Sequence, residues 1–138
     1  MSSNEEYYYY PGDMIYSKDL VFLDTLKHDI RIKGHPVIIL TVANFGDKFY
    51  GLKISGTYNY SEGLKNYYTL KPNPKKKIYK TSYIDLRYIY ELECKNNPPI
   101  ESVVTQEEFE IILNKLKSVQ AIRKHENYKY IEEYYKRV

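Results

Sequence analysis

Short apolar runs alternate with charged or turn-forming segments along the first half of the chain. The run from Met14 to Ser17 predicts the start of one strand, and Lys48 to Ser55 predicts another. Between them, Pro36 to Ala43 is nearly continuous in apolar and β-branched residues, which predicts a central strand covered on both faces. Residues 44–47 have the composition of a turn, and 18–34 form a long polar connection. This succession is typical of a small antiparallel barrel.

Alternation returns between Lys77 and Glu93, where it fits either two strands or one bent strand. The segment before it, Gly56 to Lys80, is rich in lysine and turn-forming residues, and we interpret it as a loop.

A helix is predicted after Thr105, because Thr105 and Glu108 have the spacing of a capping box, in which each side chain satisfies a backbone donor at the helix start. The apolar residues that follow recur at helical spacing and form one stripe: Phe109, Ile112, Leu113, Leu116 and Val119. A second helical stretch is expected from about Asn127, with a break near residues 123–126.

The length of 138 residues favours one domain with a sizeable core, and 43% hydrophobic with 28% charged residues is ordinary for a folded protein. No apolar run is long enough to span a membrane, and the first residues do not resemble a signal peptide. The single cysteine, Cys94, excludes an internal disulfide framework. We therefore expect a cytoplasmic protein without a membrane partner.

Positive charge is concentrated in Gly56 to Lys80, which carries a net charge of +5 against +3 for the whole chain. Five tyrosines lie in the same segment. Lysines pair with phosphates and tyrosine rings stack on bases, so this composition predicts contacts with single-stranded RNA. The candidate contact residues here are Lys65, Tyr67, Tyr68, Lys75, Lys76 and Lys77. A solvated surface loop whose tyrosines pack on the barrel is the alternative.

The order of several short motifs resembles the PemK/MazF-like toxin family over roughly residues 11–118. These motifs are Gly12-Asp13, His35-Pro36 with the apolar run after it, Ile54-Ser55, Ser82 to Leu86, and Thr105 to Glu108. The chain also looks like the ToxN-type relatives, whose antitoxin is an RNA. The resemblance implies an α+β fold over a single domain, residues 1–138. In that fold a small SH3-like antiparallel β-barrel packs with a C-terminal helix. Residues 119–138, which lie beyond the resemblance, are expected to add a C-terminal helical arm.

The resemblance further implies a metal-independent endoribonuclease that cuts single-stranded RNA, forms a homodimer and is neutralised by a protein or RNA antitoxin. Such cleavage needs a base for the 2′-OH proton, a proton donor for the leaving oxygen, and positive charge beside the phosphate. His35 occupies the place of the family's arginine, and Ser55 that of its strand-end Thr or Ser. Lys53 shares a strand face with Ser55, because side chains alternate along a strand.

Further candidates surround these three residues. Arg31 and Lys33 would supply additional charge for RNA, and His28 and Asp85 are candidates for proton transfer. The chain has no Gly-rich phosphate loop ending in Lys-Ser/Thr, no zinc-spaced Cys/His cluster and no Gly-x-Ser-x-Gly elbow, so no cofactor or metal is expected.

Two other interpretations remain. In the first, the chain is a catalytically inactive SH3-like barrel module that binds RNA or a protein partner, since His35 is a poorer fixed cation than the family's arginine. His35 would then be an ordinary strand-entry residue and Ser55 a strand-end cap. In the second, it is a structural interaction protein that uses its tyrosine-rich ends.

Overall fold

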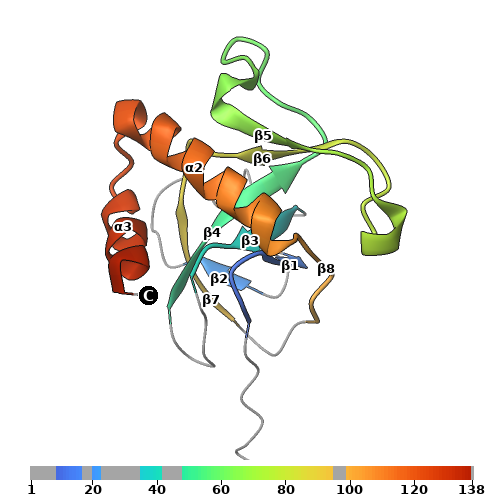
Figure 1. The fold of residues 1–138 in the computed structure, drawn as a ribbon, viewed down its shortest axis with the longest axis horizontal. Helices are drawn as coiled ribbons and strands as arrows, with labels where there is room; N and C mark the ends of the chain where they lie inside the picture. The colour runs from blue at the N-terminus through green and yellow to red at the C-terminus, as the bar shows by residue number, and fades with distance from the viewer. Residues whose placement is uncertain (1–8, 17–19, 23–34, 42–47, 95–98, 138) are drawn as a thin grey trace, which may run out of the picture.

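The protein folds as a curled antiparallel sheet, a half-barrel, with two helices packed against it (Figure 1). The computed structural model describes residues 9–16, 20–22, 35–41, 48–94 and 99–137. The predicted α+β class is confirmed at this level. Within the described residues, no helix is long and apolar enough to cross a membrane.

Among the described residues, eight short strands form the sheet in the order β2-β7-β4-β3-β1-β8, with β6 also paired to β4 and β5 paired to β6. Their bounds are β1 (Asp13–Tyr16), β2 (Leu20–Phe22), β3 (Pro36–Ile39), β4 (Phe49–Ser55), β5 (Tyr67–Leu70), β6 (Ser82–Asp85), β7 (Tyr90–Cys94) and β8 (Ser102–Val103).

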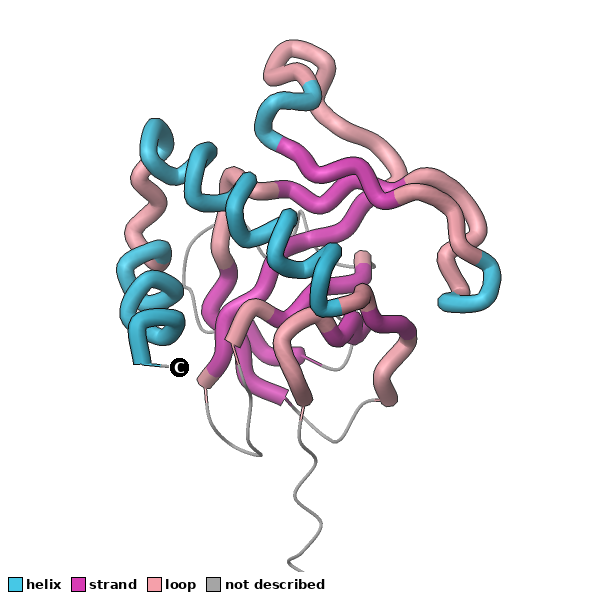
Figure 2. The backbone as a smooth tube through the Cα atoms, in the orientation of Figure 1, coloured by secondary structure: helices cyan, strands magenta, loops and turns pink. Residues whose placement is uncertain are grey.

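Strand β4 is the centre of the curl because it pairs with three other strands. One edge of β4 pairs with β3, whereas the other pairs with β7 through Phe49–Gly51 and with β6 through Ile54 and Ser55. The sheet therefore turns away at the middle of β4, and the β5–β6 hairpin projects beyond the rest of the strands (Figure 2).

Both faces of the sheet are buried along its centre, as predicted for the apolar run after Pro36. Ile38 and Leu52 pack on the face that carries the helices, together with Ile112 and Leu116. The opposite face holds a second cluster, whose buried members are Tyr9, Ile15, Val37, Ile39, Phe49, Tyr90 and Leu92. Hydrophobic side chains pointing alternately into two clusters explain why this segment is apolar at nearly every position.

Gly51 marks a close approach between β4 and β3. A Cβ atom built on it would lie 2.6 Å from Cγ1 of Val37 and 2.9 Å from the carbonyl oxygen of Ile38. A side chain at this position would therefore displace backbone atoms of the neighbouring strand.

Helix α2 (Gln106–Arg123) begins where the sequence predicts. Thr105 accepts a hydrogen bond from the backbone N–H of Glu108 at 3.0 Å, and Phe109, Ile112, Leu116 and Val119 are buried. The second half of the expected capping box differs, because the Glu108 carboxylate accepts a hydrogen bond from the Tyr68 hydroxyl at 2.9 Å. Glu108 thus ties the helix start to β5.

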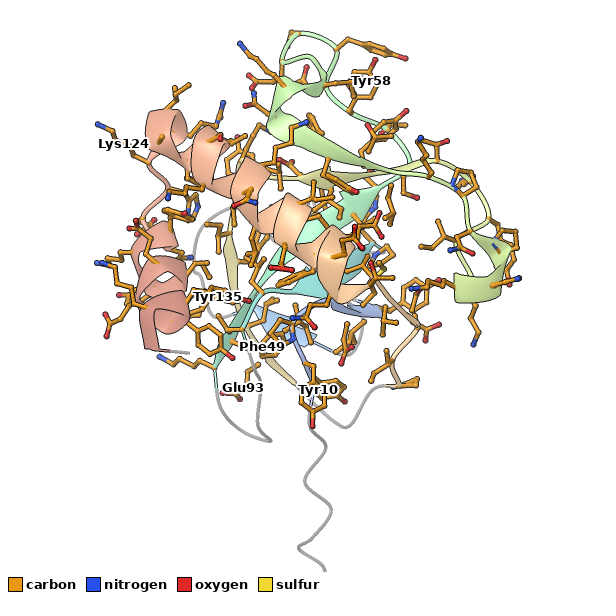
Figure 3. All side chains as sticks on the ribbon, in the orientation of Figure 1. Tyr10, Phe49, Tyr58, Glu93, Lys124 and Tyr135 are labelled. Atoms are coloured by element: carbon orange, nitrogen blue, oxygen red, sulfur yellow. The ribbon has the colours of Figure 1, made fainter. Side chains whose placement is uncertain are left out.

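Helix α2 ends at Arg123 and α3 (Tyr128–Arg137) follows, so the predicted break near residues 123–126 and the second helix from about Asn127 are confirmed. Lys124 ends α2 in the left-handed conformation, with φ 53° and ψ 48°. Helix α3 then packs on the sheet. Ile131 is 2% exposed, Tyr130 stacks on Tyr50 with ring centroids 5.4 Å apart, and the Tyr135 hydroxyl donates to the carbonyl of Leu40 (Figure 3).

Two segments interpreted as connections are strands. Tyr67–Leu70 forms β5 within the segment that we expected to be a basic loop, and Leu20–Phe22 forms β2, paired with β7. The prediction missed both because charged or turn-forming residues flank them and resemble loop sequence. The partner of β2, strand β7, is also distant along the chain. The alternation from Lys77 to Glu93 resolves into two strands, β6 and β7.

Candidate functional site

The pairing of β3 with β4 brings His35 and Ser55 together. Val37 faces Lys53 and Ile38 faces Leu52, so continuing the same register by two residues sets His35 opposite Ser55. Residues directly opposite in an antiparallel pair have neighbouring side chains on one face of the sheet. Lys53 and Ser55, two residues apart, also share that face. The three predicted catalytic residues therefore gather where β3 begins and β4 ends.

The surroundings of His35 favour its neutral form. The side chain is half-buried, and burial lowers the pKa of the imidazole below its ordinary value. The positive charge of Lys53 lowers this pKa further, whereas a hydrogen bond with the backbone of Ile54 acts in the opposite direction. A neutral imidazole near pH 7 can accept a proton from a substrate hydroxyl.

Ser55 caps the turn that follows β4. Its hydroxyl oxygen accepts the backbone N–H of Thr57 at 3.3 Å and lies 3.5 Å from the Thr57 hydroxyl. The side chain is half-exposed, and a serine hydroxyl that accepts one bond retains a proton to donate. Ser55 can therefore cap the strand and contact a ligand oxygen.

Lys80 is a cation near the site that was not singled out as a site residue. A Cβ atom built on Gly56 would lie 3.8 Å from the Lys80 Nζ, so this ammonium stands beside the residue after Ser55. The side chain is exposed. The only sequence signal was its membership of the basic segment. Lys80 comes close to Gly56 because strand β6, which begins two residues after Lys80, pairs with the end of β4.

Lys80 also lines a cavity of about 440 Å³ on the helix-bearing face of the sheet. Its walls include apolar core residues such as Met14, Ile54 and Leu70 and the polar side chains of Lys77 and Glu101. Ile54 precedes Ser55 and points to the opposite face, so this cavity and the His35–Ser55 site lie on different sides of β4.

Asp85 is engaged by Arg87. The Arg87 Nε lies 3.0 Å from Oδ1 and Nη2 lies 2.8 Å from Oδ2, and the backbone N–H of Arg87 also donates to Oδ1 at 3.0 Å. Asp85 is 1% exposed. These hydrogen bonds with Asp85 raise the pKa of Arg87 above its ordinary value. The geometry favours a structural ion pair over the proton-transfer role proposed for Asp85.

The same guanidinium connects several elements. Arg87 lies 5.1 Å from the ring centroids of both Tyr67 and Tyr88. Glu62 Oε1 stands 4.0 Å from Nη1 of Arg87 and 3.0 Å from Nη1 of Arg123, near the end of α2. The loop after β4, the sheet and α2 are therefore joined by paired charges of opposite sign.

Tyr67 and Tyr68, both predicted to contact RNA, point to opposite faces and are occupied by protein groups. Tyr67 is 3% exposed, and its hydroxyl accepts the backbone N–H of Asn59 at 3.2 Å. Tyr68 faces the helices, where burial and then its hydrogen bond to Glu108 raise the pKa of its hydroxyl to about 12. In this arrangement neither ring presents a free face beside Ser55.

The predicted RNA-contacting lysines lie at the two ends of the β5–β6 hairpin (Figure 1). Lys65 is in the short 3-10 turn Leu64–Asn66 before β5, whereas Lys75 and Lys76 are in the turn Pro74–Lys76 after it and Lys77 follows. The ion pairs found within the described part of the chain join Arg87 and Arg123 to acids and include none of these lysines.

Three remaining candidates, His28, Arg31 and Lys33, lie outside the described residues. Within residues that are described, no group of three or more His, Cys, Asp or Glu side chains could hold a metal ion.

Comparison with protein-family models gives no match to the chain, and comparison with curated proteins gives none either. We therefore infer function from the residues and their geometry.

Proposed function

We propose that the protein is a metal-independent endoribonuclease that cuts single-stranded RNA, a toxin of the PemK/MazF-like type built on an SH3-like barrel. The observation that supports this proposal most directly is the pairing of Val37 with Lys53, a register that places His35 opposite Ser55 when it is continued by two residues. The hydrogen bond of His35 with the backbone of Ile54 agrees with that placement. A base, a hydroxyl donor and a cation within one site are the groups that RNA cleavage by the 2′-OH requires.

In this mechanism His35 is the base, Ser55 is a hydrogen-bond donor, and Lys53 is both the cation and the proton donor. The neutral His35 imidazole takes the proton from the 2′-OH, and the 2′-oxygen attacks the adjacent phosphorus. The Ser55 hydroxyl donates a hydrogen bond to a non-bridging oxygen, and the Lys53 ammonium stabilises the added negative charge. The bond from phosphorus to the 5′-oxygen then breaks, and that oxygen takes a proton from Lys53. The products are a 2′,3′-cyclic phosphate and a 5′-hydroxyl.

The lysines of the β5–β6 hairpin would attract the phosphate backbone. Lys65 and Lys75 are exposed at opposite ends of the hairpin, and the exposed Lys80 lies beside Gly56, the residue that follows β4. Attraction of this kind is independent of sequence and weakens as salt rises. Arg31 and Lys33 are proposed to add to it.

The resemblance to the toxin family extends the proposal to partners. We expect a homodimer in the cytoplasm, held inactive by an antitoxin that is either a protein or an RNA.

Cleavage of a single-stranded RNA in EDTA tests the proposal. The wild-type protein should give discrete cuts ending in a 2′,3′-cyclic phosphate. His35→Ala should reduce the rate at least about a hundredfold, the effect typical of losing a positioned proton-transfer group. Ser55→Ala should also reduce it at least about a hundredfold, the effect typical of losing a hydrogen-bond donor to the developing negative charge. Lys117→Ala, at an exposed position on α2, is the matched control and should cut normally.

A 2′-O-methylated copy of the same RNA should remain intact, because it has no 2′-OH to attack. Cuts that persist in both variants, or in the methylated strand, would refute the mechanism. Salt-sensitive binding without any cut would instead identify the chain as a non-catalytic barrel module.

A further inference from the structure

Four tyrosine rings meet at the end of the sheet where β4 stops. Tyr58, in the loop after β4, is at their centre (Figure 3). Its ring centroid lies 4.8 Å from that of Tyr60, 4.9 Å from that of Tyr83 and 5.9 Å from that of Tyr67, with the rings inclined by 58° to 61°. Edge-to-face contacts of Tyr58 with Tyr67 and Tyr83, and a tilted contact with Tyr60, hold the rings in one cluster.

The inner member of this cluster is firmly anchored. Tyr67 is 3% exposed, its hydroxyl accepts the backbone N–H of Asn59, and the Arg87 guanidinium lies over its ring. Since Asn59 belongs to the same loop as Tyr58, this bond fixes the loop to β5. The ring of Tyr58 therefore packs against a buried side chain, Tyr67, that is itself held in place.

The outer members lead from the candidate site towards solvent. Tyr83 is directly opposite Ser55 in the pairing of β4 with β6, so its side chain is on the Ser55 face. Tyr60, at the other end, is 85% exposed. The rings thus form a path that begins beside Ser55, passes over Tyr58 and ends at a ring with accessible surface.

The charge beside this path is positive. Lys65 is exposed in the turn that follows the loop, and Lys53 lies on the same sheet face as Tyr83. The single acid of the loop, Glu62, is engaged by Arg123 and by the Asn66 amide at 2.7 Å. Aromatic faces next to positive charge are the surface on which single-stranded nucleic acid binds, through stacked bases and paired phosphates.

We infer that Tyr60, Tyr58 and Tyr83 form a stacking subsite for unpaired bases of the RNA strand whose phosphate lies at Ser55. This inference deepens the proposed function and rests on it for the identity of the strand. The sequence predicted that Tyr67 and Tyr68 contact RNA, but protein groups occupy both. The inference assigns base stacking to Tyr58, Tyr60 and Tyr83 instead.

Binding measurements with strands that cannot be cut test the subsite separately from cleavage. The first probe is a fluorescent 2′-O-methylated 12-nucleotide RNA, and the second is a strand of equal length and charge with abasic residues throughout. Fluorescence anisotropy in EDTA gives the Kd of each. Tyr60→Ala should weaken binding of the first probe at least about fivefold and leave the second unchanged, because only the first has bases to stack.

Two variants provide controls. Tyr60→Phe retains the ring and should bind as the wild type does. Tyr79→Ala makes the same change at another tyrosine of the basic segment, 73% exposed and lining the cavity on the other face of β4, and should alter neither Kd.

Equal losses for both probes in Tyr60→Ala, no loss for either, or the same loss in Tyr79→Ala would overturn the stacking subsite. The cleavage assay with His35→Ala is unaffected by any of these results. If Tyr60→Ala weakens binding of only the base-bearing probe and the wild type does not cut RNA, the stacking subsite is supported and the proposed endoribonuclease activity is refuted.

Discussion

At the scale of single residues, His35 depends on what surrounds its imidazole. Burial and the charge of Lys53 both lower its pKa, so the neutral form persists to lower pH than for a free histidine. A base of this kind keeps its function as pH falls, until the lowered pKa is reached. A histidine at this position is thus suited to proton transfer, although not to carrying a fixed positive charge.

Replacing Lys53 should change the titration of His35. In Lys53→Met one cause of the lowered pKa is removed, so the pKa of His35 should rise towards its ordinary value of about 6.5. NMR titration of the imidazole signals measures this shift directly, without relying on the cleavage rate, which depends on Lys53 itself. Lys117→Met is the control for loss of a positive charge, and an unchanged His35 titration in Lys53→Met would contradict the assignment.

Arg87 should be far more important for stability than Arg123, although both contact Glu62. Arg87→Met leaves Asp85, which is 1% exposed, without its guanidinium partner, and should lower the free energy of unfolding by about 3–5 kcal/mol. Arg123→Met removes a pair whose side chains are 31% and 29% exposed and should cost no more than about 1 kcal/mol. Urea denaturation compares them, and equal losses would contradict the structural role of Arg87.

At the scale of elements, β4 positions the site because it is shared by both halves of the curled sheet. Its close contact with β3 at Gly51 makes that glycine sensitive to substitution. Gly51→Ala should lower the free energy of unfolding by about 1–3 kcal/mol, since the added methyl meets Val37 and the Ile38 carbonyl.

Gly56 provides the matched control on the same chain segment. A Cβ there would meet only the flexible end of Lys80 at 3.7 Å and 3.8 Å, so Gly56→Ala should change stability by less than about 0.5 kcal/mol. Thermal or urea unfolding measures both variants. Equal free energies of unfolding for Gly51→Ala and Gly56→Ala would contradict the prediction, because β3 and β4 would then accommodate the added methyl without loss of stability.

Elements with local signals were predictable from sequence, and those that depend on distant partners were not. Thr105 and the stripe from Phe109 to Val119 indicate α2 because a cap and a helical period are properties of neighbouring residues. Strand β5 was missed because Tyr67–Leu70 becomes a strand only by pairing with β6. The residues on both sides of it have loop-like sequence, so nothing local marks where the strand begins or ends. The same holds for the site. The shared face of Lys53 and Ser55 follows from alternation along one strand and was predictable, whereas the approach of Lys80 to Gly56 and the tyrosine cluster depend on the folded structure and were not.

At the scale of the whole molecule, α3 is part of the core. Ile131 is buried with residues of the sheet and α2, while Tyr130 and Tyr135 contact Tyr50 and Leu40. Ile131→Ala should lower the free energy of unfolding by about 2–5 kcal/mol. The same change at Ile122, 83% exposed on α2, should alter it by less than about 0.5 kcal/mol. Calorimetry of the full chain compares the two, and similar stabilities would place α3 outside the cooperative unit.

The three-way pairing of β4 protects the site against errors of alignment. A slip by one position along β3 would turn Lys53 and Ser55 towards the helices, but it would also break the matches with β6 and β7. The main chain of β3, β4 and β6 therefore sets the spacing of His35, Lys53, Ser55 and Tyr83. A change at His35 or Lys53 would replace one chemical group of the site and leave the positions of the other three as they are.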